Sequence, residues 1–124
     1  MRIYNVFPRL AGPVSEWTPH LARAADLGFN ALFINPVQKP GYSGSLYSVV
    51  DYQALNPLLV DTKSKVSPED QMRKVLTQAR EDFGLTPVVD LVINHCAFDS
   101  AILKSNPEWF HWDNGQVVHP SCDE

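Results

Sequence analysis

The segment Pro87-Val-Val-Asp-Leu-Val-Ile-Asn-His95 decides how this chain folds. Its apolar run is interrupted once, by Asp90, and is closed by Asn94 and His95. A helix-like pattern over residues 67–83 precedes it, and that order is typical of a strand that enters a parallel sheet and is buried on both faces. A carboxylate inside such a strand is costly to bury unless it is paired or hydrogen-bonded. Polar residues at the carboxyl end of the strand lie where α/β barrels place their active sites.

Strand and helix patterns alternate on either side of this segment. Strands are predicted over residues 2–7, 30–35 and 86–93, and helices over residues 18–28, 67–83 and 100–105. Residues 36–65 are expected to form a long irregular connection, of the kind that is usually functional or disordered. The β-α-β-α-β order, with right-handed crossovers, fits either a doubly wound open sheet or the first three strands of a (β/α)8 barrel. Periodicity alone does not separate these two architectures.

Composition restricts the class of protein and its partners. A length of 124 residues predicts one domain, about half of a usual barrel of ~250 residues. The net charge of −4 argues against nucleic acid or an anionic membrane as a partner. No stretch has the ~18 continuous apolar residues of a membrane span. The first residues have the pattern of a strand rather than of a signal peptide, so a cytoplasmic location is expected.

The cysteines and histidines do not form a metal-binding pattern. Cys96 and Cys122 lack a C-x-x-C spacing, and an intracellular chain would keep them reduced, which disfavours a disulfide. Together with His95, His111 and His119 they are scattered, whereas structural zinc sites use close pairs of ligands. The sequence has no Gly-x-Gly-x-x-Gly, Walker or Gly-x-Ser-x-Gly motif, which disfavours dinucleotide, nucleotide and serine-hydrolase functions.

The pattern Asp90-x-Val92-x-Asn94-His95 resembles the first signature region of the α-amylase superfamily, glycoside hydrolase family 13. The resemblance implies that Asp90 supports the arginine beside the catalytic nucleophile and that His95 binds a hydroxyl of the sugar at the cleaved bond. It also implies that Asn94 ligates a structural calcium, as in many members of the family; no other cofactor is implied. The residues themselves allow structural roles instead. Asp90 could cap a turn or pair with a distant arginine, Asn94 could satisfy backbone groups, and His95 could bond its own loop.

The stretch Leu46-Tyr-Ser-Val-Val-Asp-Tyr52 resembles a second family pattern, Gly-Tyr-Asp-x-x-Asp-Tyr. Both tyrosines and the second aspartate are kept, whereas Leu46 and Ser48 replace the glycine and the first aspartate. The family's first tyrosine stacks on the sugar beside the cleaved bond, so the resemblance implies substrate binding by Tyr47. An aromatic ring suits the apolar C–H face of a sugar. The structural alternative is that Tyr47 and Tyr52 cover the end of the sheet.

The resemblance implies an α/β fold: the N-terminal portion, about three β/α units, of a (β/α)8 TIM barrel that is incomplete in this sequence. Residues 1–95 would form the first three strands and two helices, and residues 96–124 the start of the domain inserted after the third strand. The implied function is that of a fragment of an α-glucan-active retaining glycoside hydrolase or transglycosylase. Its ligand would be an α-1,4-glucan or maltooligosaccharide. Residues 3–9 and 40–47 further resemble maltosyltransferase-like bacterial members.

Retaining glycosidases need a nucleophile and an acid/base about 5 Å apart. The family carries these two carboxylates on its fourth and fifth strands, so the resemblance implies that this chain lacks them. Two other functions remain open: a non-catalytic sugar-binding or interaction module, and an unrelated α/β enzyme. Three strands of a barrel would leave two open edges and expose Phe33, Val89 and Leu91. We therefore expect that the isolated chain forms a homo-oligomer through its open edges, or that it is part of a larger polypeptide.

Overall fold

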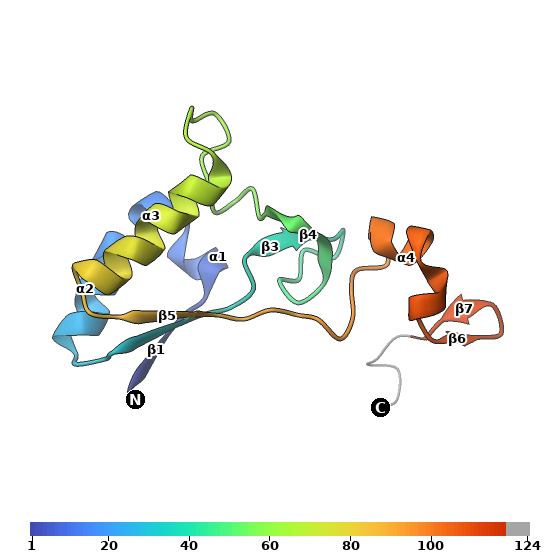
Figure 1. Cartoon of the computed structure of the whole chain (residues 1–124), viewed down its shortest axis with the longest axis horizontal. Coiled ribbons are helices and arrows are strands. Elements are labelled where there is room, and N and C mark those ends of the chain that lie inside the picture. Colours follow the sequence, from blue (N-terminus) through green and yellow to red (C-terminus); the bar gives the residue numbers. More distant parts are fainter. Residues whose placement is uncertain (119–124) are drawn as a thin grey trace.

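The structure is a computed structural model that describes residues 1–118. A parallel sheet with its helices lies at one end, a two-stranded ribbon lies in the middle, and a small helical and β unit lies at the other end (Figure 1). No helix among residues 1–118 is long and apolar enough to cross a membrane. The elements are β1 (Ile3–Val6), α1 (Pro8–Ala11), η1 (Val14–Glu16), α2 (Thr18–Asp26), β2 (Ala31–Ile34), β3 (Gln38–Pro40), β4 (Val49–Leu55), α3 (Pro68–Glu81), β5 (Thr86–Val89), α4 (Ala101–Ser105), η2 (Pro107–Trp109), β6 (Trp112–Asp113) and β7 (Gln116–Val117).

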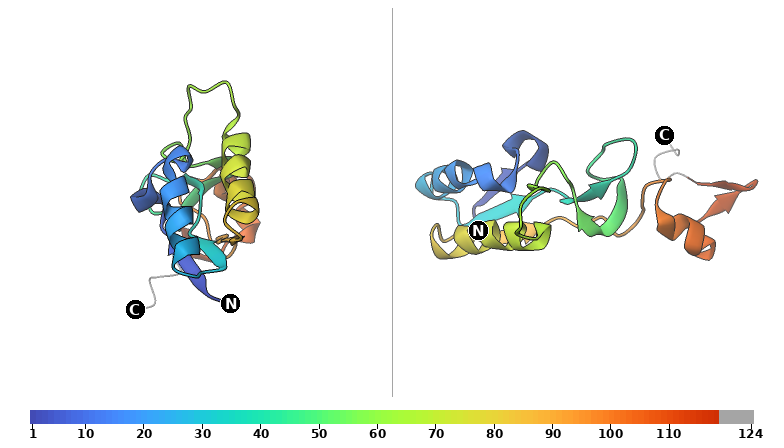
Figure 2. Two further views of the ribbon diagram at one scale, coloured as in Figure 1. Left: turned by 90° about the vertical axis from the view of Figure 1, so that its left-hand side faces the viewer. Right: turned by 90° about the horizontal axis from the view of Figure 1, so that it is seen from above.

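The three predicted strands form one parallel sheet in the order β1-β2-β5, which confirms the β-α-β-α-β arrangement. α2 and α3 lie side by side along this sheet (Figure 2). Their buried faces pack with Leu32 and Ile34 of β2 in one hydrophobic core. The core also contains Trp17, which is fully buried and whose indole Nε1 donates a hydrogen bond to the carbonyl of Gly12 at 2.9 Å.

α3 begins and ends at the signals that the sequence contains. Ser67 is its N-cap, and the Ser67 hydroxyl accepts a hydrogen bond from the backbone N–H of Asp70 at 3.1 Å. Pro68 occupies the first helical turn, where no N–H partner is needed. The chain leaves the helix through Gly84, whose φ of 62° is a left-handed conformation that glycine adopts without strain. After Gly84 the chain enters β5, which pairs with β2.

The predicted end of the third strand was wrong, because β5 stops at Val89 rather than at residue 93. Its neighbour β2 ends at Ile34, whose carbonyl accepts the last hydrogen bond, from the backbone N–H of Asp90 at 2.8 Å. Pro36, close behind, has no N–H to extend the pairing. Asp90 therefore lies just after the strand and is only half-buried.

Burial of this strand on both faces was also wrong. β5 is an edge strand in the described part of the chain, and the helices cover only one face of the sheet (Figure 1). Val89 is 40% exposed and Leu91 is 52% exposed, which confirms that these side chains meet water, whereas Phe33 on the central strand is half-buried. On the face opposite the helices, Ile3 is 51% exposed and Val88 is 39% exposed, so that face of the sheet is open.

The prediction of one irregular connection over residues 36–65 is wrong, because this stretch contains two paired strands. β3 and β4 form an antiparallel ribbon in which Pro40 pairs with Val49 and Gln38 pairs with Leu55, with register shifts between these pairs. The overlooked sequence signal is the alternation of polar Asp51 and Gln53 with apolar neighbours along β4, where the polar residues are exposed and the apolar ones are half-buried. The ribbon matters for function because the turn at its end, residues 41–48, carries Tyr47.

Candidate functional site

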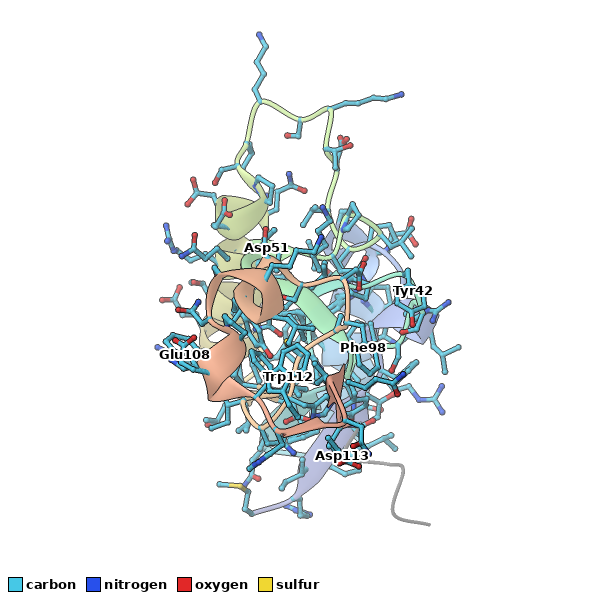
Figure 3. All side chains as sticks on the ribbon, turned by 90° about the vertical axis from the view of Figure 1, so that its right-hand side faces the viewer. Tyr42, Asp51, Phe98, Glu108, Trp112 and Asp113 are labelled. Carbon is cyan, nitrogen blue, oxygen red and sulfur yellow. The ribbon has the colours of Figure 1, made fainter. Side chains whose placement is uncertain are left out.

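A pocket of about 950 Å³ lies where the ribbon turn, the segment after β5 and the α4–β7 unit meet. It brings together Tyr47, Asn94 and His95, which come from two separate parts of the sequence. Tyr42 and Phe98 also line it and are labelled in Figure 3, which views the molecule from this end. The volume lies within the range of small-molecule binding sites, ~300–1,000 Å³. The pocket is therefore the candidate ligand site of the chain.

Tyr47 is 42% exposed, and its hydroxyl is held by a protein group. The side-chain amide of Asn35, at the end of β2, donates a hydrogen bond to the Tyr47 hydroxyl oxygen at 2.6 Å. The backbone N–H of Tyr47 donates to the hydroxyl of Ser45 at 3.3 Å. The phenol ring is thereby fixed at its tip and at its backbone, with its ring against the pocket.

His95 is half-buried and is held through its main chain. The hydroxyl of Tyr52 on β4 donates a hydrogen bond to the carbonyl oxygen of His95 at 2.6 Å. The His95 ring nitrogen Nδ1 lies 3.1 Å from Oδ1 of Asn94. Because an amide oxygen only accepts, this contact places a proton on Nδ1 and leaves Nε2 for a ligand. The His95 side chain thus makes a hydrogen bond within its own loop and also lines the pocket.

Two further hydrogen bonds fasten the segment after His95 to the ribbon. The backbone N–H of Ala97 donates to the carbonyl of Val49 at 2.8 Å. The fully buried Ser100 donates from its hydroxyl to the carbonyl of Val50 at 2.9 Å. Since β4 supplies both acceptors, the position of His95 depends on the ribbon as well as on β5.

Gly41 allows the ribbon turn to approach this segment closely. A Cβ atom built on Gly41 would lie 2.5 Å from the Ala97 Cβ and even closer to the Asp99 carboxylate, so any larger residue would displace them. Asp99 in turn accepts a hydrogen bond from the backbone N–H of Tyr42 at 3.1 Å. Glycine is therefore required at position 41 because a side chain would overlap Ala97 and Asp99, and not because of its backbone conformation.

Two ionisable groups that line the pocket, Tyr52 and Cys96, have raised pKa values. Burial raises the pKa of the Tyr52 hydroxyl, and the neighbouring Cys96 raises it further. Burial also raises the pKa of the Cys96 thiol, against the opposing effect of a hydrogen bond with Ser100. Tyr52 accordingly keeps, at neutral pH, the proton that it donates to the carbonyl of His95.

Asp90 does not line the pocket. Its carboxylate has no hydrogen bond or ion pair with any of residues 1–118, so it neither caps a turn nor pairs with an arginine in this part of the chain. The sequence grouped Asp90 with Asn94 and His95, but the structure places only the latter two at the pocket. The supporting role of Asp90 remains a prediction.

The described residues do not by themselves fit a metal ion. Asn94 is exposed, and its only side-chain oxygen faces His95, whereas calcium takes six to eight oxygen ligands. No group of three or more His, Cys, Asp or Glu side chains among residues 1–118 is arranged to hold a metal. Calcium at Asn94 therefore stays a prediction. His119 and Cys122, which entered the zinc and disulfide hypotheses, lie outside the described residues.

Sequence reasoning missed Asn35, Gly41 and Ser100, and it did not foresee the hydrogen bond of Tyr52 to His95. Asn35 could have been suspected from its place at the end of a predicted strand, and Gly41 from its place next to Pro40 in a turn. Nothing in the local sequence signals the roles of Tyr52 and Ser100, because their partners lie 43 and 50 residues away along the chain. Such long-range partners are visible only in the folded molecule.

The parallel sheet, with Tyr47, Asn94 and His95 in a pocket beyond its strands, agrees with an α-amylase-type protein, and comparison with known proteins assigns the family. The chain belongs to the family described as the glucanotransferase domain of glycogen debranching enzyme, whose model matches residues 1–114. This family membership excludes the alternative that the chain is part of an unrelated α/β enzyme.

Individual relatives agree with this assignment. The glycogen debranching enzyme of Saccharomyces cerevisiae is 32% identical over 94 residues, 76% of this chain and 6% of that protein. A cyclomaltodextrinase of Thermoanaerobacter pseudethanolicus is 29% identical over 92 residues, 71% of this chain and 14% of that protein. The crystal structure of an α-amylase from Lactobacillus plantarum superimposes with a TM-score of 0.81 at 31% identity, over 98% of this chain and 29% of that one. The chain thus spans less than a third of each of these relatives.

Proposed function

We propose that this chain is the N-terminal part of the catalytic domain of an enzyme that cleaves or transfers α-1,4-linked glucosyl units with retention of configuration. The observation that carries the proposal is the pocket that joins Tyr47 to His95, in a chain that belongs to a glucanotransferase family. Each motif alone has a structural explanation. Their convergence on one pocket of ligand size favours the functional one.

The chemical roles follow from the geometry of the pocket. The Tyr47 ring offers an apolar plate for the C–H face of a glucosyl ring. The Nε2 atom of His95, left over by the contact to Asn94, is available for a sugar hydroxyl. Both groups bind and orient the sugar; neither is the nucleophile or the acid/base, which we expect from later strands of the domain. The unpartnered carboxylate of Asp90 would hold an arginine from those strands.

The sheet also supports the proposal that this chain is the first part of a larger catalytic domain. β1, β2 and β5 are parallel and in sequence order, the helices cover one face, and the opposite face carries Ile3, Phe33 and Val88 without a covering layer. An apolar face that is left open is what the first three strands of a (β/α)8 barrel would present before the remaining strands close around it. We place residues 1–95 in this barrel and residues 96–124 in the domain inserted after its third strand.

Replacement of His95 tests this proposal. In the complete protein that contains this chain, His95→Ala should lower kcat/KM on maltooligosaccharides by roughly 1–3 kcal/mol of transition-state stabilisation, the cost of leaving a buried polar group unpaired. His20→Ala, on α2 and outside the pocket, is the matched control and should retain wild-type kinetics.

Two outcomes would reject the proposal. Unchanged kinetics of His95→Ala would remove this residue from the site. Maltotriose binding without any turnover by the wild-type protein would instead favour a non-catalytic sugar-binding module. Turnover by the wild type together with a selective loss in His95→Ala supports the proposed enzyme.

A further inference from the structure

The residues that orient Tyr47 form a short hydrogen-bonded chain across the ends of two strands. The side-chain amide of Asn5, on β1, donates to the side-chain oxygen of Asn35 at 3.1 Å. The amide of Asn35 donates in turn to the hydroxyl oxygen of Tyr47 at 2.6 Å. Neither asparagine lines the pocket. They can affect a ligand there only through the tyrosine.

The direction of this chain is set by a backbone group. The Asn5 amide nitrogen also lies 3.5 Å from the carbonyl oxygen of Phe33, which can only accept. That carbonyl therefore turns the amide nitrogen of Asn5, rather than its oxygen, towards Asn35. Asn35 must then present its oxygen to Asn5 and its amide hydrogens to Tyr47. The order of donors is thus fixed from the sheet outwards.

The consequence for Tyr47 is specific. The phenol oxygen receives the Asn35 donor, so the phenol's own proton is left to be donated elsewhere. No acceptor for that proton is found among residues 1–118. A hydrogen bond at the tip of the ring also restricts rotation of the side chain, so that the ring is presented in one orientation before a sugar arrives.

We propose that Asn5 and Asn35 are positioning residues of the glucan site, which fix the ring of Tyr47 and direct its hydroxyl proton to a hydroxyl oxygen of the bound glucosyl unit. The inference rests on the proposed function, because it takes Tyr47 as a sugar-binding residue. The inference adds a hydrogen-bond donor role for the phenol of Tyr47, and it extends the site to the carboxyl ends of β1 and β2.

Double-mutant cycles in the complete protein test this network. Asn35→Leu, which keeps the size of the side chain but cannot donate, should lower kcat/KM on maltotriose about 2- to 12-fold, the equivalent of one hydrogen bond. Tyr47→Phe, which keeps the ring, should cause a similar loss. The double variant should lose little more than either single variant, because each removes the same interaction.

Asn5→Ala provides a second cycle with Tyr47→Phe that does not depend on the folding of Asn35→Leu. Asn30→Leu is the matched control: the Asn30 side chain accepts a hydrogen bond from the backbone N–H of Arg2 at the opposite end of β2, so its loss should leave kcat/KM unchanged.

The outcomes separate the network from the proposed function. A wild-type protein without activity on maltooligosaccharides would reject the proposed function, and this inference with it. An active wild type in which the losses from Asn5→Ala or Asn35→Leu multiply fully with that from Tyr47→Phe would reject the network alone, since a merely structural role does not depend on the phenol hydroxyl. Losses that do not multiply support the assignment.

Discussion

The substitution Gly41→Ala should damage the site from outside the pocket. The added Cβ would lie 2.5 Å from the Ala97 Cβ, about 1 Å inside ordinary van der Waals contact, and closer still to the Asp99 carboxylate. The segment that follows His95 must then move away from the ribbon by a comparable distance. Overpacking of this kind costs about 1–3 kcal/mol of stability. A displacement of about 1 Å at a binding residue can lower the rate ~100-fold.

The assay is kcat/KM on maltotriose, together with thermal unfolding of the complete protein. Gly41→Ala should lower kcat/KM by about 10- to 100-fold. Combining it with Ala97→Gly removes the Cβ–Cβ overlap and should recover part of the loss. Wild-type kinetics and stability in Gly41→Ala would refute the close docking of the ribbon on the segment after His95, and with it the claim that the ribbon positions the histidine.

Three further predictions concern the reaction, alkaline stability and the isolated chain. Incubation of the complete protein with maltotriose should give longer maltooligosaccharides, as detected by chromatography; glucose and maltose alone would indicate hydrolysis. The pKa values of Cys96 and Tyr52 are higher in the folded protein than in the unfolded one. These two groups therefore stabilise the fold fully at a pH below their unfolded pKa values, and this stabilisation is lost as the pH rises through their folded pKa values. The free energy of unfolding should therefore fall above about pH 8.5, and a constant value up to pH 11 would contradict this. The isolated 124-residue polypeptide should self-associate in sedimentation experiments without hydrolysing starch, and Leu91→Lys with Ile93→Lys should weaken association; a cooperative monomer would contradict it.

The fold was predictable from the sequence wherever a local signal coincided with the tertiary structure. Ser67, Pro68 and Gly84 delimit α3 by local hydrogen bonding and backbone geometry, so the sequence located this helix closely. The end of β5 was misplaced because it depends on where the neighbouring β2 ends. Apolar residues 91–93 continue the pattern of the strand although they have no pairing partner in the described sheet.

The site was predictable only in part, for a related reason. Motif resemblance led to Tyr47 and His95, and the structure places both in one pocket. It did not lead to Asn35, nor to the hydrogen bond by which Tyr52 holds His95, because these contacts join groups distant in the sequence. Asp90 stands in the same motif as His95 yet lies outside the pocket, so membership in a motif does not establish a shared location.

The central claim is that Tyr47 and His95 bind one glucosyl unit between them. A crystal structure of the complete protein with maltotriose, in a variant made inactive at the nucleophile, tests it most directly. We expect a glucosyl ring stacked on Tyr47, with a hydroxyl within hydrogen-bonding distance of Nε2 of His95. A sugar bound elsewhere, with both side chains covered by other parts of the protein, would contradict it.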